Sequence, residues 1–285
     1  MDGARGGAYH PVVESDAART VTIDAPRPVA QTTRATAVDV LVSLTASDLR
    51  ARYGRGPLRI FKWLLDPFAL VGVYLLLVTF VLSTGGRAPG LSIACAVVPF
   101  QLIMSTVMNA MMAVTTRRTI ILNMGFRRAL IPVASALTES VAFLASFTLF
   151  MLMMAAYRVE PTSALVWLPL VVAANIFFAI GIAYPSSLFG LWFRDLRNFG
   201  LSFIRTLFFL APGLVAFSQI HGRAHEWLQF NPLTGLFEAY RAVLLFGKAP
   251  APWEILYPCG CALVMLLVFV PFYRSEQRQF AKIVE

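Results

Sequence analysis

Two charged side chains, Glu139 and Arg205, lie inside long apolar runs of this sequence. Charged groups inside membrane-spanning segments pair with one another or mark an ion or substrate pathway. Glu139 lies about nine residues into the run 130–157, roughly 13 Å from its start, and Arg205 about six residues into the run 199–217, roughly 9–10 Å from its start, at the α-helical rise per residue. Both runs begin on the same side by the distribution of basic residues, so the sequence predicts an interhelical ion pair. The alternative is that Arg205 extends to the membrane surface while Glu139 separately faces a wet cavity.

Motifs for catalysis, nucleotides and metals are missing from the sequence. It has no G-x-x-x-x-G-K-[ST] phosphate loop, and the nearest string, at 246–249, lacks the spacing and the hydroxyl. His221 and His225 have a spacing compatible with a metal, but no third ligand accompanies them. Cys259 and Cys261 form a C-x-C without a nearby histidine and are better explained as small packing residues. We therefore expect no metal, no cofactor and no enzymatic activity in this chain.

The composition is that of an integral membrane protein. Of 285 residues, 58% are hydrophobic and only 14% are charged, whereas soluble domains have about 45–50% and about 25%. The mean hydropathy is +0.70. The net charge of +9 is explained by basic cytoplasmic loops rather than by a nucleic-acid partner.

Six apolar runs are long enough to cross a bilayer, which takes roughly 20 residues each. The sequence therefore predicts an all-α integral membrane fold with six transmembrane helices, at about 67–84, 91–114, 130–157, 164–193, 199–217 and 252–273. Residues 1–37 have the composition of a disordered tail, and 274–285 form a second, basic tail. Most arginines outside the spans then fall on one side, which places both termini in the cytoplasm by the positive-inside rule.

Residues 38–66 form the approach to the first span. Apolar residues recur at helical spacing between Val38 and Tyr53, with polar residues on the opposite face. This pattern predicts an amphipathic helix along the cytoplasmic membrane surface, although an ordinary soluble helix has the same pattern. The segment is strongly basic, with Arg50, Arg52, Arg55 and Arg59.

Two segments between the spans have helical patterns of their own. The loop Thr115–Arg128 is basic at both ends and apolar in the centre. It predicts a short cytoplasmic helix that docks into a groove on a partner, or alternatively an extension of the flanking spans at the membrane surface.

The second segment, 218–251, predicts a helix on the external side. Asn231 and Pro232 suit its N-cap and first position. An apolar stripe follows, with Glu238 and Arg241 off it. We expect this helix to dip in from the outer face, after a shorter element at 221–230.

Several motifs together resemble a known family. They are R-Y-x-x-G-P-L at Arg52–Leu58 with Trp63 and Pro67, Phe193–Arg197 before the fifth span, Pro212 within it, and Asn231-Pro232-Leu233 followed by Glu238–Arg241. Over residues 38–285 the chain resembles the membrane permease of type-2 ABC exporters, in the branch that exports O-antigens, teichoic acids, capsules and galactan. One departure is Gly56-Pro57-Leu58, where the family more often has a short hydrophobic run ending in Leu-Gly.

The resemblance implies a homodimer in the bacterial cytoplasmic (inner) membrane, bound to two copies of a separate cytoplasmic ABC ATPase subunit. ATP and Mg would be bound by that partner. The substrate would be a polysaccharide, possibly galactan given the Ala-, Val- and Arg-rich composition, carried on a polyprenyl pyrophosphate lipid.

The resemblance also implies roles for individual residues. ATPase coupling would involve Arg117, Arg118, Asn123, Met124, Gly125 and Phe126, and the external gate Asn231, Pro232, Phe237, Tyr240 and Arg241. A channel at the dimer interface would be lined by Tyr74, Phe80, Phe100, Phe203, Phe208 and Phe209, since sugar rings stack on aromatic faces. The pyrophosphate would meet Arg50, Arg52, Arg55 and Arg59 at the cytoplasmic entrance, for which plain attraction to anionic lipids is the simpler explanation.

Two other functions are compatible with the pattern. One is an ABC permease of the same type for a small molecule or drug, and the other is an ATP-independent flippase for a lipid-linked glycan. A neighbouring ATPase gene would exclude the flippase, and adjacent glycosyltransferase genes would favour a polysaccharide over a drug.

Overall fold

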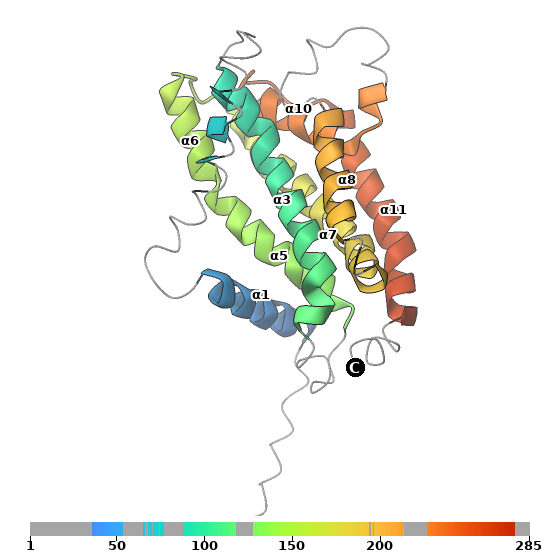
Figure 1. The fold of residues 1–285 in the computed structure, drawn as a ribbon. Helices are drawn as coiled ribbons and strands as arrows, with labels where there is room; N and C mark the ends of the chain where they lie inside the picture. The colour runs from blue at the N-terminus through green and yellow to red at the C-terminus, as the bar shows by residue number, and fades with distance from the viewer. Residues whose placement is uncertain are drawn as a thin grey trace, which may run out of the picture. The chain divides into compact units, whose positions relative to one another are not determined.

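The computed structural model describes residues 36–53, 88–117, 128–193, 197–211 and 227–276, with isolated positions between 65 and 76 and at 195 and 213. These residues form helices and their connections, without a β-strand in the described part of the chain (Figure 1). The elements are α1 (Ala37–Tyr53), α3 (Pro89–Thr116), α5 (Leu130–Ala145), α6 (Phe147–Ala156), the 3₁₀ helix η2 (Ser163–Trp167), α7 (Leu168–Trp192), α8 (Arg197–Leu210), α10 (Pro232–Leu244) and α11 (Pro252–Glu276).

Four stretches in the described residues are long and apolar enough to cross a membrane: Pro89–Thr116, Leu130–Ala156, Ser163–Trp192 and Pro252–Glu276. They correspond to the second, third, fourth and sixth spans predicted from the sequence. Most of the predicted first span lies outside the described residues. Of the predicted fifth span, the structure describes α8 and little beyond it.

The sequence predicts the third span as one apolar run. The structure divides this run into two helices, α5 and α6, at Ser146. The Ser146 amide donates to the carbonyl of Phe143 across 2.9 Å, and the Leu149 amide donates to the carbonyl of Ser146 across 3.0 Å. Both bonds connect residues three apart, so the α-helical ladder tightens here. Figure 1 shows α5 and α6 following different directions on either side of this point.

Helices α3 and α7 form the centre of the bundle. From Leu91 to Val98, α3 is buried around most of its circumference, because α5, α7, α8 and α10 all pack against it. A Cβ added to Gly190 of α7 would lie 2.2 Å from the carbonyl oxygen of Met111 on α3. Glycine at this position therefore permits the close approach of two backbones that membrane helices use for packing.

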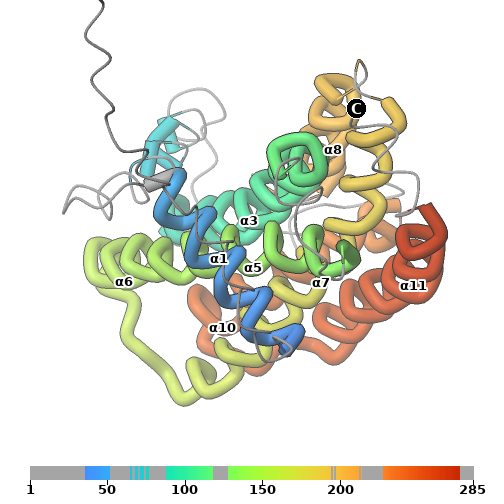
Figure 2. The backbone as a smooth tube through the Cα atoms, turned by 90° about the horizontal axis from the view of Figure 1, so that it is seen from below, coloured from blue at the N-terminus to red at the C-terminus, as the bar shows by residue number. Residues whose placement is uncertain are grey.

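Helix α1 lies crosswise to α3 and α5 and packs against α5 (Figures 1 and 2). Leu44 and Leu49 are buried, while Val38 and Val42 are exposed. The Thr36 hydroxyl and Asp39 carboxylate cap its first turn through bonds of 2.6–3.3 Å. The hydrogen bonds from Thr36 hold the pKa of the Asp39 carboxyl below its ordinary value, so the cap is in its ionised form at neutral pH.

Helix α10 lies at the end of the bundle away from α1 (Figure 1). It packs against α3, α7 and α11. Its end is formed by Gly247, whose φ of 62° is the left-handed conformation that glycine favours. The string 246–249, compared above with a phosphate loop, thus closes this helix.

Candidate functional site

Asn231 starts α10 and ties it to α8. Its Oδ1 accepts from the Leu233 amide at 3.0 Å, which satisfies one of the free donors at a helix start. Its Nδ2 donates to the carbonyl of Leu207 on α8 at 2.8 Å. Pro232 occupies the first helical position, where its missing N–H costs nothing. The helix start predicted from Asn231 and Pro232 is therefore present, and one side chain both caps α10 and binds a second helix.

Arg241 is completely buried near the other end of α10. Its Nη1 donates to Glu238 Oε1 at 2.6 Å. Its Nε donates to the carbonyl of Ser92 on α3 at 3.3 Å, and its Nη2 donates to the carbonyl of Gly213, beyond α8, at 3.0 Å. A buried guanidinium needs such partners because an unpaired charge inside a protein is costly. We call Asn231, Glu238 and Arg241, with these backbone partners, the α10 cluster.

Glu238 and Arg241 lie off the apolar stripe of α10 in the sequence, yet the structure covers both side chains. Arg241 is fully buried, and Glu238 is only 11% exposed. The reason is that α10 is covered on several sides, by α3, α7 and α11, rather than lying with one face on the bundle.

Two aromatic rings of α10 itself pack against rings of neighbouring helices. Tyr240 stacks on Phe150 of α6 with ring centroids 5.9 Å apart. Phe237 lies edge-on to Phe208 of α8 at 5.8 Å, and Phe208 packs on Phe100 of α3 at 4.6 Å. Such pairs stabilise a packed core by about 0.5–1.5 kcal/mol each beyond their buried area. The structure thus brings two of the expected channel residues, Phe100 and Phe208, together with the gate residue Phe237.

The other expected channel residues lie elsewhere. Phe203 and Phe209 are 56% and 60% exposed on α8. Tyr74 and Phe80 lie outside the described residues.

A second polar cluster lies where α1 meets α3 and α5. Arg117 at the end of α3 forms an ion pair with Asp48 of α1. The same guanidinium donates to Ser135 Oγ of α5 at 3.3 Å and to the carbonyl of Ile131 at 3.4 Å. The Thr138 hydroxyl donates to the carbonyl of Ala134 in its own helix at 2.8 Å and lies 3.5 Å from Asp48 Oδ2. Asp48, Arg117, Ser135 and Thr138 line a cavity of about 330 Å³, which we call the α1 pocket.

Glu139 also lines the α1 pocket. It is 5% exposed, and its Oε1 accepts from Asn109 Nδ2 of α3 at 2.6 Å. Arg205 does not line this pocket but is exposed on α8. The two residues of the predicted ion pair therefore lie in different surroundings, on α5 and α8.

Most of the residues expected to couple to an ATPase lie outside the described residues: Arg118, Asn123, Met124, Gly125 and Phe126. Arg117 is described, and its ion pair with Asp48 joins the start of that loop to α1. Of the four expected entrance arginines, Arg50 is exposed on α1. The side chain of Arg52, and Arg55 and Arg59, are outside the described part of the chain.

Sequence reasoning missed Asp48, Asn109, Ser135 and Thr138. The signal for Asn109 was an amide inside an apolar run. For Ser135 it was a hydroxyl four positions before Glu139, and for Thr138 a hydroxyl three positions after Ser135, both at spacings that share a helix face. Nothing in the sequence near Asp48 indicates a partner 69 positions away.

No group of three or more histidine, cysteine or carboxylate side chains capable of holding a metal occurs among the described residues. His221 and His225 lie outside them. Cys259 and Cys261 are free thiols, partly buried in α11.

Apolar helices long enough to span a bilayer, joined near both ends by buried polar contacts, define a multi-pass helical membrane protein. No family model matches the chain. Three curated proteins are similar to it, all named O-antigen export system permease protein RfbA. Two from Klebsiella pneumoniae are 24% and 23% identical over 248 residues, which are 86% of this chain and 95% of each relative. One from Myxococcus xanthus is 25% identical over 246 residues, which are 85% of this chain and 94% of the relative.

These relatives confirm the resemblance to type-2 ABC permeases for polysaccharide export that the motifs indicated. Because the similarity extends over almost the whole length of each relative, it concerns the complete helical unit rather than one shared motif.

Proposed function

We propose that this chain is the membrane-spanning permease subunit of an ATP-driven exporter that moves a polysaccharide, attached to polyprenyl pyrophosphate, out of the cytoplasm. The observation that carries the proposal is the end-to-end similarity to O-antigen export permeases. It is supported by the α10 cluster, in which the residues of the N-P-L and E-x-Y-R motifs contact α3 and α8. Galactan is the specific polysaccharide we suggest.

The proposed complex contains two copies of this chain and two copies of a cytoplasmic ABC ATPase, which binds ATP and Mg. The chain lies in the bacterial inner membrane with both termini in the cytoplasm, so that α1 lies at the cytoplasmic surface and α10 near the external one. The positive-inside rule supports this orientation, because it places the basic loops on the cytoplasmic side.

The ATPase is proposed to act on the loop Thr115–Arg128. Helix α3 runs from this loop to Ser92, which is bonded to Arg241. At 1.5 Å per residue, the distance from Arg117 to Ser92 along the helix is roughly 37 Å, about a bilayer thickness. A displacement of α3 would therefore move α10 through the direct hydrogen bond between Ser92 and Arg241. The external gate is proposed to consist of Asn231, Pro232, Phe237, Tyr240 and Arg241.

The polymer is proposed to pass along a channel at the interface of the two copies, with Tyr74, Phe80, Phe100, Phe203 and Phe209 providing aromatic surfaces. Phe208, which is only 2% exposed, would support these rings from the core rather than face the polymer. Arg50, Arg52, Arg55 and Arg59 would receive the pyrophosphate at the cytoplasmic entrance by charge-assisted hydrogen bonds. Exposure of Phe203, Phe209 and Arg50 supports these assignments.

Depletion of this chain in its own host tests the proposal. We expect lipid-linked glycan to accumulate inside the cell while surface polysaccharide falls. Normal surface polysaccharide without an internal accumulation would contradict the proposal and favour a small-molecule substrate. Export that continues when the partner ATPase is inactivated would favour an ATP-independent flippase.

A further inference from the structure

Helix α8 carries a line of exposed polar side chains, which we call the α8 stripe: Asn198, Ser202, Arg205 and Thr206. They stand at helical positions i, i+4, i+7 and i+8 and therefore share one face of the helix. The hydroxyls of Ser202 and Thr206 donate to carbonyls of their own helix at 2.9 and 3.0 Å. The side chains of Asn198 and Arg205 make no hydrogen bond or ion pair with any other described residue. The amide and the guanidinium thus decide what the α8 stripe can face.

Arg205 lies deep in the bundle. Helix α8 runs alongside α3 in the opposite direction, with Gly200 next to the side chain of Met111 and the ring of Phe208 packed on Phe100 at 4.6 Å. At 1.5 Å per residue, Phe100 is roughly 16 Å from the start of α3 and 24 Å from its end. Arg205, three residues before Phe208, is therefore roughly 20 Å from either end of α3 and 12 Å from the start of α8. Arginines that extend to a membrane surface do so from near a helix end, so this explanation does not apply to Arg205.

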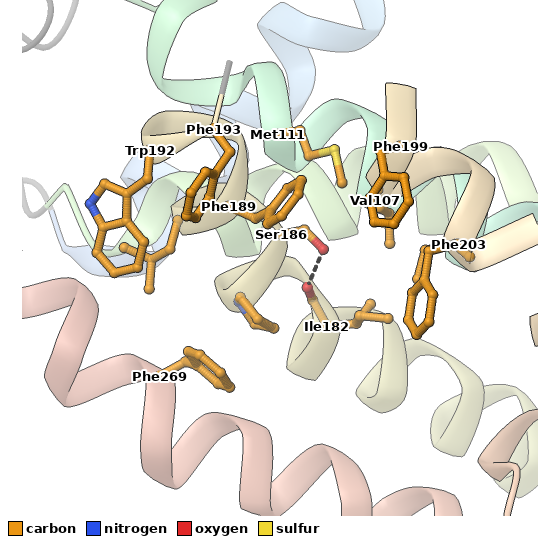
Figure 3. Close-up of a pocket in the computed structure, with 14 residues that line it drawn as sticks. Val107, Met111, Ile182, Ser186, Phe189, Trp192, Phe193, Phe199, Phe203 and Phe269 are labelled. Atoms are coloured by element: carbon orange, nitrogen blue, oxygen red, sulfur yellow. Dashed lines mark hydrogen bonds between the residues drawn. The ribbon is translucent and has the colours of Figure 1, made fainter. Parts of the chain in front are cut away.

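The neighbouring exposed surfaces are apolar. On the other exposed side of α8, Phe199 contributes with Phe269 of α11 to the wall of an apolar groove of about 410 Å³ (Figure 3). From Leu256 to Phe272 of α11, no exposed residue is charged or carries an amide. These surfaces suit contact with lipid chains, whereas a charged side chain in contact with lipid is costly. The α8 stripe therefore faces a different environment from that of the surfaces beside it.

We propose that the α8 stripe lines a water-filled passage and that the guanidinium of Arg205 is a fixed cation in its wall. Anionic or hydroxyl-rich solutes suit such a wall, because a guanidinium donates hydrogen bonds to both and the bonds to anions are charge-assisted. The inference deepens the proposed function and rests on it only for the identity of the solute. It adds polar side chains and a charge to the aromatic residues of the proposed channel, and a second copy of this chain would provide the opposite wall.

Thiol labelling of the full chain, in complex with its ATPase in phospholipid nanodiscs, tests the passage. The three native cysteines are first replaced by alanine. Single cysteines are then introduced in the α8 stripe, as Ser202→Cys or Thr206→Cys, and at two exposed apolar controls, as Leu210→Cys on the same helix or Val264→Cys on α11. A charged methanethiosulfonate reacts with the thiolate, which forms in contact with water.

The two cysteines of the α8 stripe should react severalfold faster than the two controls. Equal rates at all four positions would overturn the inference. So would a stripe that stays unreactive in the folded complex but reacts after denaturation, since it would then be packed against protein.

The charge of the reagent tests Arg205. In the Ser202→Cys chain, the rate with an anionic methanethiosulfonate divided by the rate with a cationic one should fall severalfold on Arg205→Gln. Arg205→Lys keeps the charge and should keep the ratio. An unchanged ratio in Arg205→Gln would contradict the placement of this guanidinium in the wall of the passage.

Neither measurement depends on transport. Selective labelling of the α8 stripe, in a chain whose depletion leaves lipid-linked glycans unchanged, would uphold the passage and reject the exporter. Loss of export on depletion, with an unreactive α8 stripe, would uphold the exporter and reject the passage at this face.

Discussion

The guanidinium of Arg241 on α10 donates from Nε to the carbonyl oxygen of Ser92 on α3 across 3.3 Å, joining positions 149 residues apart in the chain. The same side chain binds Glu238 and the carbonyl of Gly213. One buried cation thus holds three segments together near the proposed external gate.

Loss of the Arg241 guanidinium should destabilise the fold strongly. Arg241→Met leaves the carboxylate of Glu238 without its buried partner, and breaking such a pair costs about 3–5 kcal/mol. The melting temperature of the purified permease should therefore fall clearly, whereas Arg205→Gln, at an exposed position of α8, should change it little. Adding Glu238→Gln to Arg241→Met should recover part of the loss, and an unchanged melting temperature in Arg241→Met would contradict the role of this pair.

The two hydrogen bonds of Asn231 can be separated by substitution. Asn231→Asp keeps an acceptor for the Leu233 amide but removes the donor to the Leu207 carbonyl, while Asn231→Ala removes both. We expect Ala to cost about 1 kcal/mol of helix capping that Asp retains. If the bond to α8 matters for the gate, both variants should lose export. Full export by Asn231→Asp would show that only the cap is needed.

The ion pair of Asp48 and Arg117 should be energetically coupled. Replacing either Asp48 or Arg117 alone by a neutral residue is expected to destabilise the complex. A double-mutant cycle should give a coupling free energy of about 0.5–3 kcal/mol between the two residues. The charge swap Asp48→Arg with Arg117→Asp should recover part of the ATPase stimulation lost in either single reversal. Purely additive losses of stability in the double variant would mean that the contact between Asp48 and Arg117 does not stabilise the packing of α1 on α3.

Because α3 and α7 pack closely at Gly190, replacing Gly190 by alanine should affect stability more than replacing Gly260 by alanine. Gly190→Ala places a methyl group against the backbone of Met111 and should cost about 1–3 kcal/mol through overpacking. Gly260→Ala has open space around the new methyl and should be neutral or stabilising, since alanine is the better helix former. Thermal unfolding of the two purified variants would compare them, and equal stability would mean that the helices are further apart.

Glu139→Gln and Arg205→Gln should have additive effects on export. Glu139 is bonded to Asn109 in the α1 pocket, while Arg205 is exposed on α8. Measuring surface polysaccharide in the two single variants and the double variant would check this. A double variant that performs much better than the sum of the single losses would instead support the ion pair inferred from the sequence.

The elements with a strong local signal could be predicted from the sequence. Long apolar runs give the four spans in the described residues, and Asn231-Pro232 gives the start of α10, because capping depends on adjacent residues. The break at Ser146 could not be predicted, since the apolar run continues through it without proline or glycine.

The sequence pattern could not predict contacts between segments that are distant in the chain. Periodicity indicates which residues share a face of a helix, but not how many faces neighbouring helices will cover. For this reason the position of Arg241 off the apolar stripe did not indicate its burial, although α3, the segment at Gly213 and its own helix provide partners. The pair of Asp48 and Arg117 depends in the same way on the crosswise placement of α1.

Reconstitution of transport tests the proposed function most directly. The full chain and its ATPase are placed in proteoliposomes loaded with labelled polyprenyl-pyrophosphate-linked glycan, and transfer of the glycan across the bilayer is followed by its accessibility to an added glycosidase. Transfer should require ATP, both subunits and an intact ATPase site. Transfer that proceeds at the same rate without ATP, or none at all while the complex hydrolyses ATP in response to a different substrate, would contradict an ATP-driven polysaccharide exporter.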